Sequence, residues 1–570
     1  MRKALYLTFV ALWTLCLLFV SQPVSSYSAG SQSLYQKVDI SNPITLESSM
    51  LYTGGPLNSG EDLWFSFIPK QTGSYEISVR GEGGLSGTLF DAHSSKIIMQ
   101  NETVEGSDIL KLANTCLAEK NYFIKVSSIH PGAFINQLEI AIEELPAPND
   151  EFFNEQWSLF NPLNGIDINI IPVWKNYKGS IITIGVADTG VDYQHPDLIN
   201  RLDMSLAYNF THDMKDVFPE NEKSSASSAR AGHGTHVSGI ISAQSNNNQG
   251  IAGITSQGSV VPLKVLGSRL TDTSVYNGSI AAFVKAVEYA KANDIRIINC
   301  SFGGANPAVT EQEAMYQAND ILFVIAAGNS GSNLADYPEY PASYYHDNSL
   351  VVAAQNMEGN LAAFSNYGGP TDIAAPGESI ISTFPNSLYL YNSGTSMAAP
   401  VVSAVSGLVW GNAPYLTALE VKEIVTDVNN VTLVDSLSNK VHSGGMVNAF
   451  KAMMSAEPRT ESRRFENKKR DIFGKNLKSS IDSYLQKADE ALKTNQIIVK
   501  FAAGVNAEEY INTLEKEELL TGVHFIDYLS SVDAYVLQLS NMEEADKAIT
   551  ALNNSNNILY AEPNYLRESN

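Results

Sequence analysis

Three short segments of the sequence carry side chains whose types together suit nucleophilic catalysis. Asp188 ends the apolar run "SIITIGVAD", His233 lies in "GHGTHVSGI", and Ser396 lies at the start of the small-residue stretch in "NSGTSMAAPVVSAVSGL". A serine hydroxyl attacks well only when a base removes its proton, and an imidazole does this near neutral pH. A carboxylate then fixes the imidazole tautomer and stabilises the imidazolium. We therefore predict Ser396 as nucleophile, His233 as general base and Asp188 as the orienting carboxylate.

A fourth residue, Asn329, is suited to stabilise the oxyanion of such a reaction. It follows an apolar run and a glycine in "IAAGNSG". A side-chain amide at this place can donate to the oxyanion together with the backbone N–H of Ser396 at a helix start. An asparagine after glycine can instead be an ordinary turn residue. His236, three residues beyond His233, is expected to support the helix start rather than to act as the base.

The residues around these motifs have the pattern of an α/β fold. Near-continuous apolar runs at 180–188, 260–266, 295–301 and 321–328 are typical of parallel strands buried on both faces. Residues 279–293 place apolar side chains at helical spacing. In a parallel sheet, functional residues gather where the strands end in loops. We predict an α/β catalytic domain over 150–455.

The segment before it, 35–145, has a different pattern. In "SYEISVR", Tyr75, Ile77 and Val79 alternate with polar residues, and similar runs recur between Gly, Ser and Asn turns. Short alternating runs separated by turns predict an antiparallel β-sandwich. We interpret "LPAPND" as the linker that follows it.

Composition and the N-terminus restrict the possible partners. The chain has 44% hydrophobic and 17% charged residues, typical of a folded globular protein, and a formal net charge of −24. This charge disfavours nucleic acid and anionic membranes as partners. Two basic residues precede an apolar run in 1–26, which predicts a cleaved secretory signal, with an uncleaved membrane anchor as the alternative. We therefore expect a secreted protein with no membrane span after cleavage.

Outside the signal there are two cysteines, Cys116 and Cys300, and they fall in different predicted domains. We expect small buried apolar residues rather than a disulfide pair or reactive thiols.

Two further regions follow the catalytic one. Residues 456–493 are polar and contain the basic cluster "RRFENKKR", which fits either a solvated linker or a processing site. Residues 494–570 show the order β-α-β-β-α-β, which is the ferredoxin-like α+β arrangement.

Taken together and in the order Asp, His, Ser, the three catalytic motifs resemble those of the subtilases, the subtilisin-like serine peptidases. The resemblance extends over about 300 residues, from "NDEFFNEQW" to "SGGMVNAFKAM". It implies a mostly parallel, seven-stranded sheet flanked by helices. It also implies cleft walls that pair with an extended peptide substrate. Ser330 follows Asn329 where some relatives carry an acid, so an uncharged S1 pocket with an apolar or aromatic preference is expected. The wall residues so implied are Ser301, Phe302, Gly303, Ala326, Ala327 and Gly328.

The resemblance also implies a structural calcium ion. Asp150, Asp197 and Asn247 match calcium-binding positions of family members, and oxygen ligands suit Ca²⁺. Ser245, Gln249 and Ile251 would then contribute backbone carbonyls. The loop "SNNNQG" is one residue longer than the common pattern, and without the resemblance it reads as an exposed turn.

Both flanking regions resemble modules found with secreted proteases. The 35–145 region is similar to the pre-peptidase C-terminal-type β-domain. The last module, which ends in "ILYAEPNY", resembles the inhibitory I9-like propeptide domain that precedes the protease in other subtilases. The resemblance implies an intramolecular inhibitor or chaperone whose tail "AEPNYLRESN" reaches the active site; a generic α/β accessory module is the alternative.

The complete expectation is a secreted, monomeric endopeptidase that acts on protein or peptide substrates and is restrained by its own C-terminal domain. The competing hypothesis is a secreted binding or adhesive pseudoenzyme that acts through its β-sandwich. The complete set of catalytic residues argues against that hypothesis.

Overall fold

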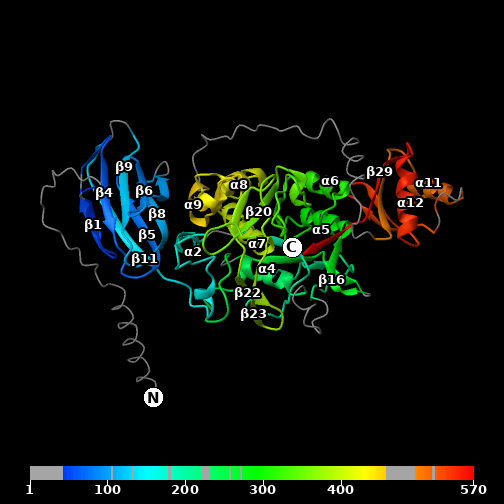
Figure 1. Cartoon of the computed structure of the whole chain (residues 1–570), viewed down its shortest axis with the longest axis horizontal. Helices are drawn as coiled ribbons and strands as arrows, with labels where there is room; N and C mark the ends of the chain where they lie inside the picture. Colours follow the sequence, from blue (N-terminus) through cyan, green and yellow to red (C-terminus); the bar gives the residue numbers. More distant parts are fainter. Residues whose placement is uncertain are drawn as a thin grey trace, which may run out of the picture.

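A computed structural model describes residues 41–569 except 42, 55, 104–106, 131–133, 178–181, 220–230, 256–257, 270–271, 457–493, 517–519 and 521. The predicted signal at 1–26 and nearly all of the predicted linker at 456–493 lie outside the described residues. Three parts follow one another along the longest axis: a β-rich N-terminal part, a central α/β part and a C-terminal α+β module (Figure 1). Among the described residues, no helix is long and apolar enough to cross a membrane.

The N-terminal part consists of two main sheets that share one core. Apart from the parallel pair β1–β4, all strand pairs are antiparallel. One sheet has the order β1 (Ile44–Leu46), β4 (Asp62–Phe67), β9 (Tyr122–Ser128), β6 (Leu85–Asp91) and β7 (Ile97–Glu102). The other has the order β2 (Leu51–Gly54), β11 (Leu138–Leu145), β5 (Gly73–Arg80) and β8 (Ile109–Cys116), and β3 (Leu57–Asn58) pairs with β10 (Phe134–Ile135).

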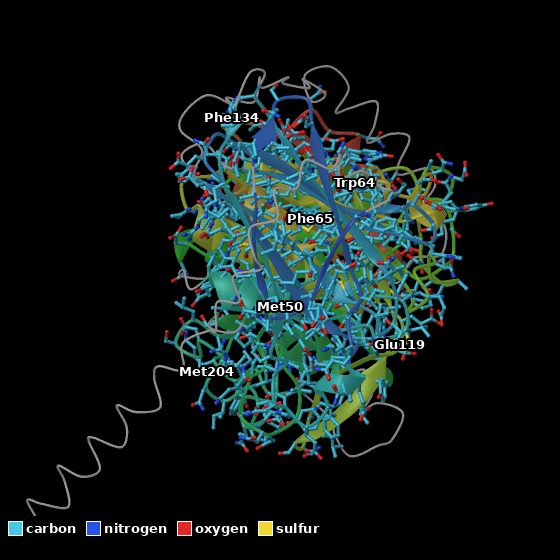
Figure 2. The ribbon with its side chains drawn as sticks, turned by 90° about the vertical axis from the view of Figure 1, so that its left-hand side faces the viewer. Met50, Trp64, Phe65, Glu119, Phe134 and Met204 are labelled. Carbon is cyan, nitrogen blue, oxygen red and sulfur yellow. The ribbon has the colours of Figure 1, made fainter. Side chains whose placement is uncertain are left out.

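Strand alternation holds in much of this part, with departures on β4 and β5. Figure 2 looks onto this end of the molecule and labels Trp64 and Phe65, successive residues of β4. Phe65 is buried in the core, whereas Trp64 stacks on Phe90 with ring centroids 5.5 Å apart. On β5, Glu76 belongs to the polar set of the alternation but is 3% exposed. It is covered because Lys175, at the end of helix α2 (Ile171–Asn176), forms an ion pair with it at 3.2 Å.

The central sheet is mostly parallel, as predicted, and has nine strands rather than seven. Its order is β13 (Tyr208–Asn209), β14 (Val260–Lys264), β12 (Ile184–Asp188), β17 (Ile297–Cys300), β19 (Leu322–Ala326), β20 (Ser349–Gln355), β21 (Ile373–Pro376), β25 (Gly445–Val447) and β24 (Val431–Leu433). The two additional strands are the short edge strands β13 and β24, and only β24 is antiparallel to its neighbour.

Helices cover both faces of this sheet. Successive residues of β17 show the consequence, because Ile297 packs in one core with α7 while Ile298 packs in the other with α5. Both faces are therefore apolar, which explains the continuous apolar runs. The principal helices are α4 (His233–Ser242), α5 (Ile280–Ala292), α6 (Val309–Gln317), α7 (Thr395–Asn412), α8 (Ala418–Thr426) and α9 (Ala449–Ser455).

The C-terminal module has the predicted element order: β26 (Gln496–Phe501), α11 (Ala507–Lys516), β27 (His524–Leu529), β28 (Ala534–Gln538), α12 (Met542–Asn553) and β29 (Ile558–Pro563). Its antiparallel sheet has the order β27-β28-β26-β29. Helices α11 and α12 pack on one face of the sheet. The other face packs on α5 and the start of α6, with Ile498 and Val536 in one apolar cluster with Ile280 and Val284.

A last strand, β30 (Leu566–Ser569), leaves the module and joins the central part (Figure 1). It lies between β16 (Asp272–Ser279) and β18 (Phe302–Gly303) and pairs antiparallel with both; β15 (Gly267–Arg269) pairs with the far side of β16.

The cysteine prediction is confirmed. Cys116 and Cys300 are both buried and unpaired. Burial raises the pKa of each thiol above its ordinary value, so both remain protonated and behave as apolar core residues.

Candidate active site

The structure brings Asp188 and His233 into direct contact. Asp188 is the last residue of β12, at the carboxyl edge of the sheet, and His233 is the first residue of α4. His233 Nδ1 lies 2.8 Å from Oδ1 and 2.9 Å from Oδ2 of Asp188, whose side chain is 1% exposed. With Nδ1–H donating to the carboxylate, Nε2 is the nitrogen left to accept a proton.

Close approach of two loops makes this contact possible. Gly190 has φ +94° and passes so near Val217 that a Cβ would lie 2.1 Å from that carbonyl oxygen. A Cβ on Gly234 would lie 2.3 Å from the Gly190 carbonyl oxygen. Thr189 joins the loops, since its Oγ1 donates to the Ala231 carbonyl at 2.9 Å and accepts from Gly234 N–H at 3.0 Å. Sequence reasoning missed Thr189, although the glycines beside it signalled a tight contact.

Ser396 is the second residue of α7 and lies beside Ser301. Its Oγ donates to the Ser301 carbonyl at 3.1 Å, and Ser301 Oγ donates back to the Ser396 carbonyl at 2.9 Å. Asn299 Nδ2 donates to Ser301 Oγ at 2.8 Å. Ser301, which the sequence predicted as a cleft-wall residue, therefore also fixes the start of the helix that carries the candidate nucleophile.

Asn329 has its amide held in one orientation. Its Oδ1 accepts from Thr395 N–H at 2.9 Å and from Thr395 Oγ1 at 3.0 Å. Thr395 Oγ1 in turn accepts from Gly328 N–H at 3.0 Å. Two donors on Oδ1 leave the Nδ2 hydrogens for a different acceptor, as an oxyanion donor requires. Thr395 was missed in the sequence because a threonine before serine carries no signal of its own.

His236 is placed as a structural residue. Its Nε2 lies 3.1 Å from the Ile380 carbonyl and 3.0 Å from the Leu390 carbonyl, in the hairpin of β22 (Ile380–Phe384) and β23 (Leu388–Asn392). Burial lowers the pKa of His236 to about 4, so the ring is neutral and donates one N–H to these carbonyls near neutral pH.

The two predicted cleft walls differ in their surroundings. Phe302 and Gly303 form β18 and pair with the tail strand β30. The segment of Ala326, Ala327 and Gly328 does not pair with that strand; Ala327 N–H donates to Val352 and Gly328 N–H to Thr395. The strand on the other side of the tail is β16, which its polar sequence "DTSVYNGS" did not identify as a wall.

A carboxylate lies beside the segment for which an uncharged pocket was expected. Ser330 Oγ donates to Glu339 at 2.8 Å, and Asn366 Nδ2 donates to it at 2.9 Å. A Cβ on Gly328 would lie 2.2 Å from Glu339 Oε2. The expectation rested on Ser330 alone and did not consider Glu339, which lies beside this segment; the P1 preference stays a prediction.

The six predicted calcium ligands lie on three segments that meet. Asp150 accepts from the N–H groups of Asn246 and Asn247 at 2.9 and 3.2 Å. Asp197 accepts from Asn247 Nδ2 at 2.7 Å and from Ile251 N–H at 3.1 Å. Burial raises the pKa of Asp197. The loop from Ser245 through Gln249 to Ile251 thus contacts both buried carboxylates.

Loop geometry keeps this region compact. Asn246, Asn248 and Gly250 all have positive φ, at +59°, +59° and +56°. A Cβ on Gly250 would lie 2.1 Å from Asp197 Oδ2, so only glycine fits there. The two carboxylates supply oxygens of the kind that suits Ca²⁺, whereas Asn247 turns Nδ2 toward Asp197 and accepts from Gln249 N–H through Oδ1 at 2.9 Å, so its amide would have to turn over to bind an ion. Within the described ranges, no group of three or more His, Cys, Asp or Glu side chains is arranged to hold a metal, so such an ion would rely on amide and carbonyl oxygens as well.

Comparison with known proteins identifies the family. Residues 179–449 match the family described as "Subtilase family". Thermitase from Thermoactinomyces vulgaris is 33% identical over 307 residues, which are 54% of this chain and 99% of thermitase. The chain belongs to the subtilase family. The major intracellular serine protease of Bacillus subtilis is 38% identical over 263 residues, 45% of this subtilase and 77% of that protein. Subtilisin Savinase from Lederbergia lenta is 33% identical over 277 residues, 48% and 91% of the two chains.

This subtilase is accordingly a subtilisin-like serine endopeptidase by family. Residues 480–564 match a second family, described as "Fervidolysin N-terminal prodomain". The prodomain-like region of this subtilase thus follows the catalytic region, which confirms the resemblance noted in the sequence. The pre-peptidase C-terminal-type identity of the N-terminal β-rich part stays a prediction.

The geometry around Asn329 leads to a testable prediction. Thr395→Val removes the Oγ1 that links Gly328 N–H to Asn329 Oδ1. We expect kcat to fall by about tenfold with little change in KM, since a buried hydrogen bond contributes about 1 to 1.5 kcal/mol. Steady-state hydrolysis of a peptide substrate measures both constants.

Thr371→Val is the matched control, because Thr371 is also fully buried and its Oγ1 donates to the Gly368 carbonyl at 2.8 Å. An unchanged kcat in Thr395→Val, or an equal loss in both variants, would contradict a positioning role for Thr395.

Proposed function

We propose that this subtilase is a secreted endopeptidase that cleaves proteins through Asp188, His233 and Ser396, and that its C-terminal module restrains it. The observation that carries the catalytic part is the buried contact of His233 Nδ1 with both oxygens of Asp188. Secretion is supported by the basic and apolar N-terminal sequence.

In the proposed reaction Ser396 Oγ attacks the scissile carbonyl carbon while His233 Nε2 accepts the hydroxyl proton. Asp188 stabilises the imidazolium that forms. The oxyanion accepts hydrogen bonds from Asn329 Nδ2 and from the Ser396 backbone N–H at the start of α7. His233 then donates its proton to the leaving amine, and water repeats the sequence on the acyl-enzyme.

Ser396→Ala tests the assignment of the nucleophile. The variant loses the attacking oxygen, so casein hydrolysis and covalent labelling by a fluorophosphonate should both be abolished while the protein stays folded. Circular dichroism checks the fold. Casein hydrolysis that persists in this variant would reject Ser396, and failure of the unmodified protein to label would reject the enzymatic assignment.

Restraint is supported by the way the C-terminal module covers two helix starts. Glu562 is buried and accepts from the N–H groups of Val309 and Thr310 at 2.8 and 2.9 Å, and also from Thr310 Oγ1. Asn564 Oδ1 accepts from Ala281 N–H, in the first turn of α5, at 3.1 Å. Helix α6 has no side-chain cap of its own, because Ala308 occupies the N-cap. The segment "AEPN" therefore supplies hydrogen-bond acceptors for backbone N–H groups at the starts of α5 and α6, which have no partner within their own helices.

Charged pairs surround this contact. Lys500 on β26 pairs with Glu313 on α6 at 2.6 Å, and Lys285 on α5 pairs with Asp527 on β27. Beyond Glu562 the tail continues as β30 along β18, which is directly adjacent to Ser301. Ser396 is fully buried in this arrangement. A strand in this place blocks the cleft against an extended substrate, and tethering it to the enzyme keeps its effective concentration high.

Glu562→Ala tests the restraint. The change leaves the Val309 and Thr310 donors without their acceptor, at a cost of about 1 to 3 kcal/mol to docking. We expect basal peptide hydrolysis by the full chain to rise by about 5- to 100-fold. A fluorogenic peptide assay on the purified full chain measures this.

Glu543→Gln is the control, since Glu543 forms an exposed ion pair with Lys547 inside α12. It should leave basal hydrolysis unchanged. If Glu562→Ala behaves like this control, the module does not restrain the enzyme through these contacts.

We further propose that the loop 245–251 binds a structural calcium ion with Asp150, Asp197 and Asn247 as side-chain ligands. The support is the convergence of two buried carboxylates on one tightly coiled loop. Backbone carbonyls of Ser245, Gln249 and Ile251 complete the expected oxygen set. The ion stabilises the fold and takes no part in the reaction.

Calcium should therefore raise thermal stability. At about 100 times its dissociation constant, an ion that binds only the folded state contributes about 2.7 kcal/mol, which corresponds to a rise of a few degrees in Tm. Differential scanning calorimetry in calcium and in EDTA measures the shift. Asp150→Asn should remove most of it, while Asp203→Asn, which changes a half-buried carboxylate outside this loop that accepts from Ser205 N–H, should keep it. A shift that Asp150→Asn leaves intact would place the ion elsewhere.

A further inference from the structure

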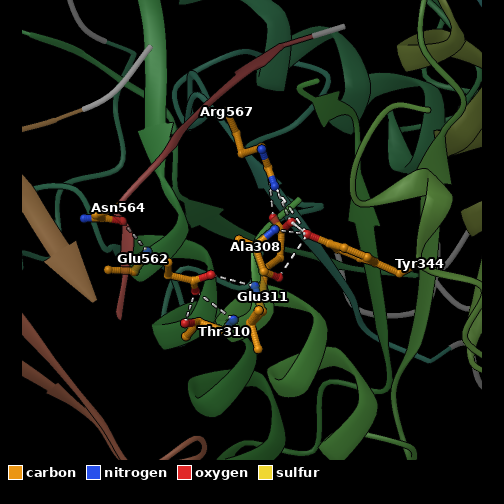
Figure 3. A network of polar contacts seen from close by, with 9 residues as sticks. Ala308, Thr310, Glu311, Tyr344, Glu562, Asn564 and Arg567 are labelled. Carbon is orange, nitrogen blue, oxygen red and sulfur yellow. Dashed lines mark hydrogen bonds and ion pairs between the residues drawn. The ribbon is translucent and has the colours of Figure 1, made fainter. Parts of the chain in front are cut away.

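The tail strand buries an arginine in the catalytic part. Arg567 is 1% exposed, and Glu311 on α6, its partner, is fully buried. Arg567 Nε lies 3.1 Å from Glu311 Oε1, and Nη2 lies 2.6 Å from Oε2 (Figure 3). This is a two-pronged pairing of a guanidinium with a carboxylate, which is a strong and directional arrangement.

The pocket around this arginine is built from the catalytic region alone. The Tyr344 hydroxyl donates to Glu311 Oε2 at 2.7 Å and lies 3.4 Å from Arg567 Nη2 (Figure 3). Tyr344 is held from the other side by Ala308, whose N–H donates to the hydroxyl at 2.8 Å. Gly304 forms a wall, since a Cβ there would lie 3.1 Å from Arg567 Nη1. All four residues lie within 179–449, and the occupant comes from the tail strand β30, which follows the prodomain-like region 480–564.

Strand register relates this pocket to the nucleophile. Ser569 lies opposite Phe302, and Glu568 lies opposite Gly303. The two strands are antiparallel, so a strand that continues in this register by one residue beyond the position opposite Phe302 places that residue opposite Ser301. The Ser301 carbonyl accepts from Ser396 Oγ at 3.1 Å. In a strand bound in this register, the residue that takes the place of Arg567 therefore lies three positions before the one opposite Ser301. In a substrate cleaved after that residue, this is position P4.

We propose that Glu311 is a specificity-determining residue that makes this enzyme cleave polypeptides with arginine at P4. The proposal rests on the proposed function, because it takes the tail strand to lie in the register of a substrate. Glu311 acts through the P4 side chain and touches no reacting atom.

Physical chemistry favours arginine over every other residue in this pocket. A carboxylate buried without a cation is costly, so an apolar P4 side chain that excludes water leaves Glu311 uncompensated. Lysine carries the charge but cannot make two parallel hydrogen bonds to one carboxylate. Citrulline has nearly the shape of arginine and no charge. The order of preference is arginine, then lysine, then citrulline.

The test uses the full chain with Arg567→Ala, so that the tail no longer fills the pocket. Its substrates are acetyl-Xaa-Glu-Ser-Asn-aminomethylcoumarin peptides, which follow the tail sequence and carry arginine, lysine or citrulline as Xaa. We expect kcat/KM for arginine to exceed that for citrulline by about 10- to 100-fold, the range that charge-assisted hydrogen bonds supply. Glu311→Gln in the same background should reduce this ratio to near one.

Glu313→Gln is the matched control on the same helix. Glu313 pairs with Lys500 of the module and not with the tail, so its loss weakens docking without touching the P4 pocket. It should leave the ratio of arginine to citrulline unchanged. Fluorophosphonate labelling of each variant shows that Ser396 is reactive and the protein folded. If Glu311→Gln fails to fold, the peptide series on Arg567→Ala alone still decides.

The outcomes separate the two proposals. Equal turnover of arginine and citrulline peptides by an Arg567→Ala chain that labels would overturn the P4 assignment, reduce Arg567 to a docking contact and leave the proposed function standing. A chain that neither labels nor cleaves any peptide would overturn the proposed function, and the P4 assignment with it.

Discussion

The buried contact between Asp188 and His233 is the constraint around which the catalytic part is built. It requires the loop after β12 and the start of α4 to approach so closely that a Cβ on Gly234 would meet the Gly190 carbonyl oxygen, and the Val217 carbonyl leaves no room for a Cβ on Gly190. Thr189 then joins the two loops with both of its hydrogen-bonding functions. An imidazole held by both carboxylate oxygens has one tautomer, and its second nitrogen remains basic. The conspicuous glycines of the two motifs are thus a packing requirement of the catalytic contact.

A second constraint comes from helix ends. The first N–H groups of an α-helix have no partner within the helix, and α6 begins with an alanine at its N-cap. In this chain the acceptor comes from another part of the molecule, through Glu562. Burial raises the pKa of this carboxyl, while the hydrogen bonds from Thr310 and Val309 lower it. The contact depends on where the module docks and not on where it stands in the chain. A prodomain-like region can therefore occupy this surface from the C-terminal side.

Sequence patterns predicted the mostly parallel sheet, the buried cysteines and the C-terminal element order, because each depends on local periodicity or on motifs with strong physical requirements. Features that depend on tertiary contacts could not be predicted from the sequence. Thr395 acquires its place only because Asn329 turns its amide toward it, and Glu339 reaches Ser330 across a loop. Strand β16 is polar in sequence, and its place is given by backbone pairing with β15 and with β30, which is far away in the chain. The spacing of apolar and polar residues along the chain does not predict contacts of this kind between distant segments.

The pairing of Arg567 with Glu311 shows how one buried interaction can serve two purposes. Burying two charges gives little net stability, because desolvation offsets most of their attraction. The same burial makes the pair highly selective, since removing either partner leaves the other uncompensated. A tail held mainly by apolar contacts could pair with β18 in more than one register, because apolar contacts are not directional. The ion pair of Arg567 with Glu311 favours a single register of β30 along β18. The same ion pair is the interaction that we propose selects arginine in a substrate. Under the two proposals, restraint and specificity share the carboxylate of Glu311, so an arginine-bearing substrate is expected to compete directly with the tail for it.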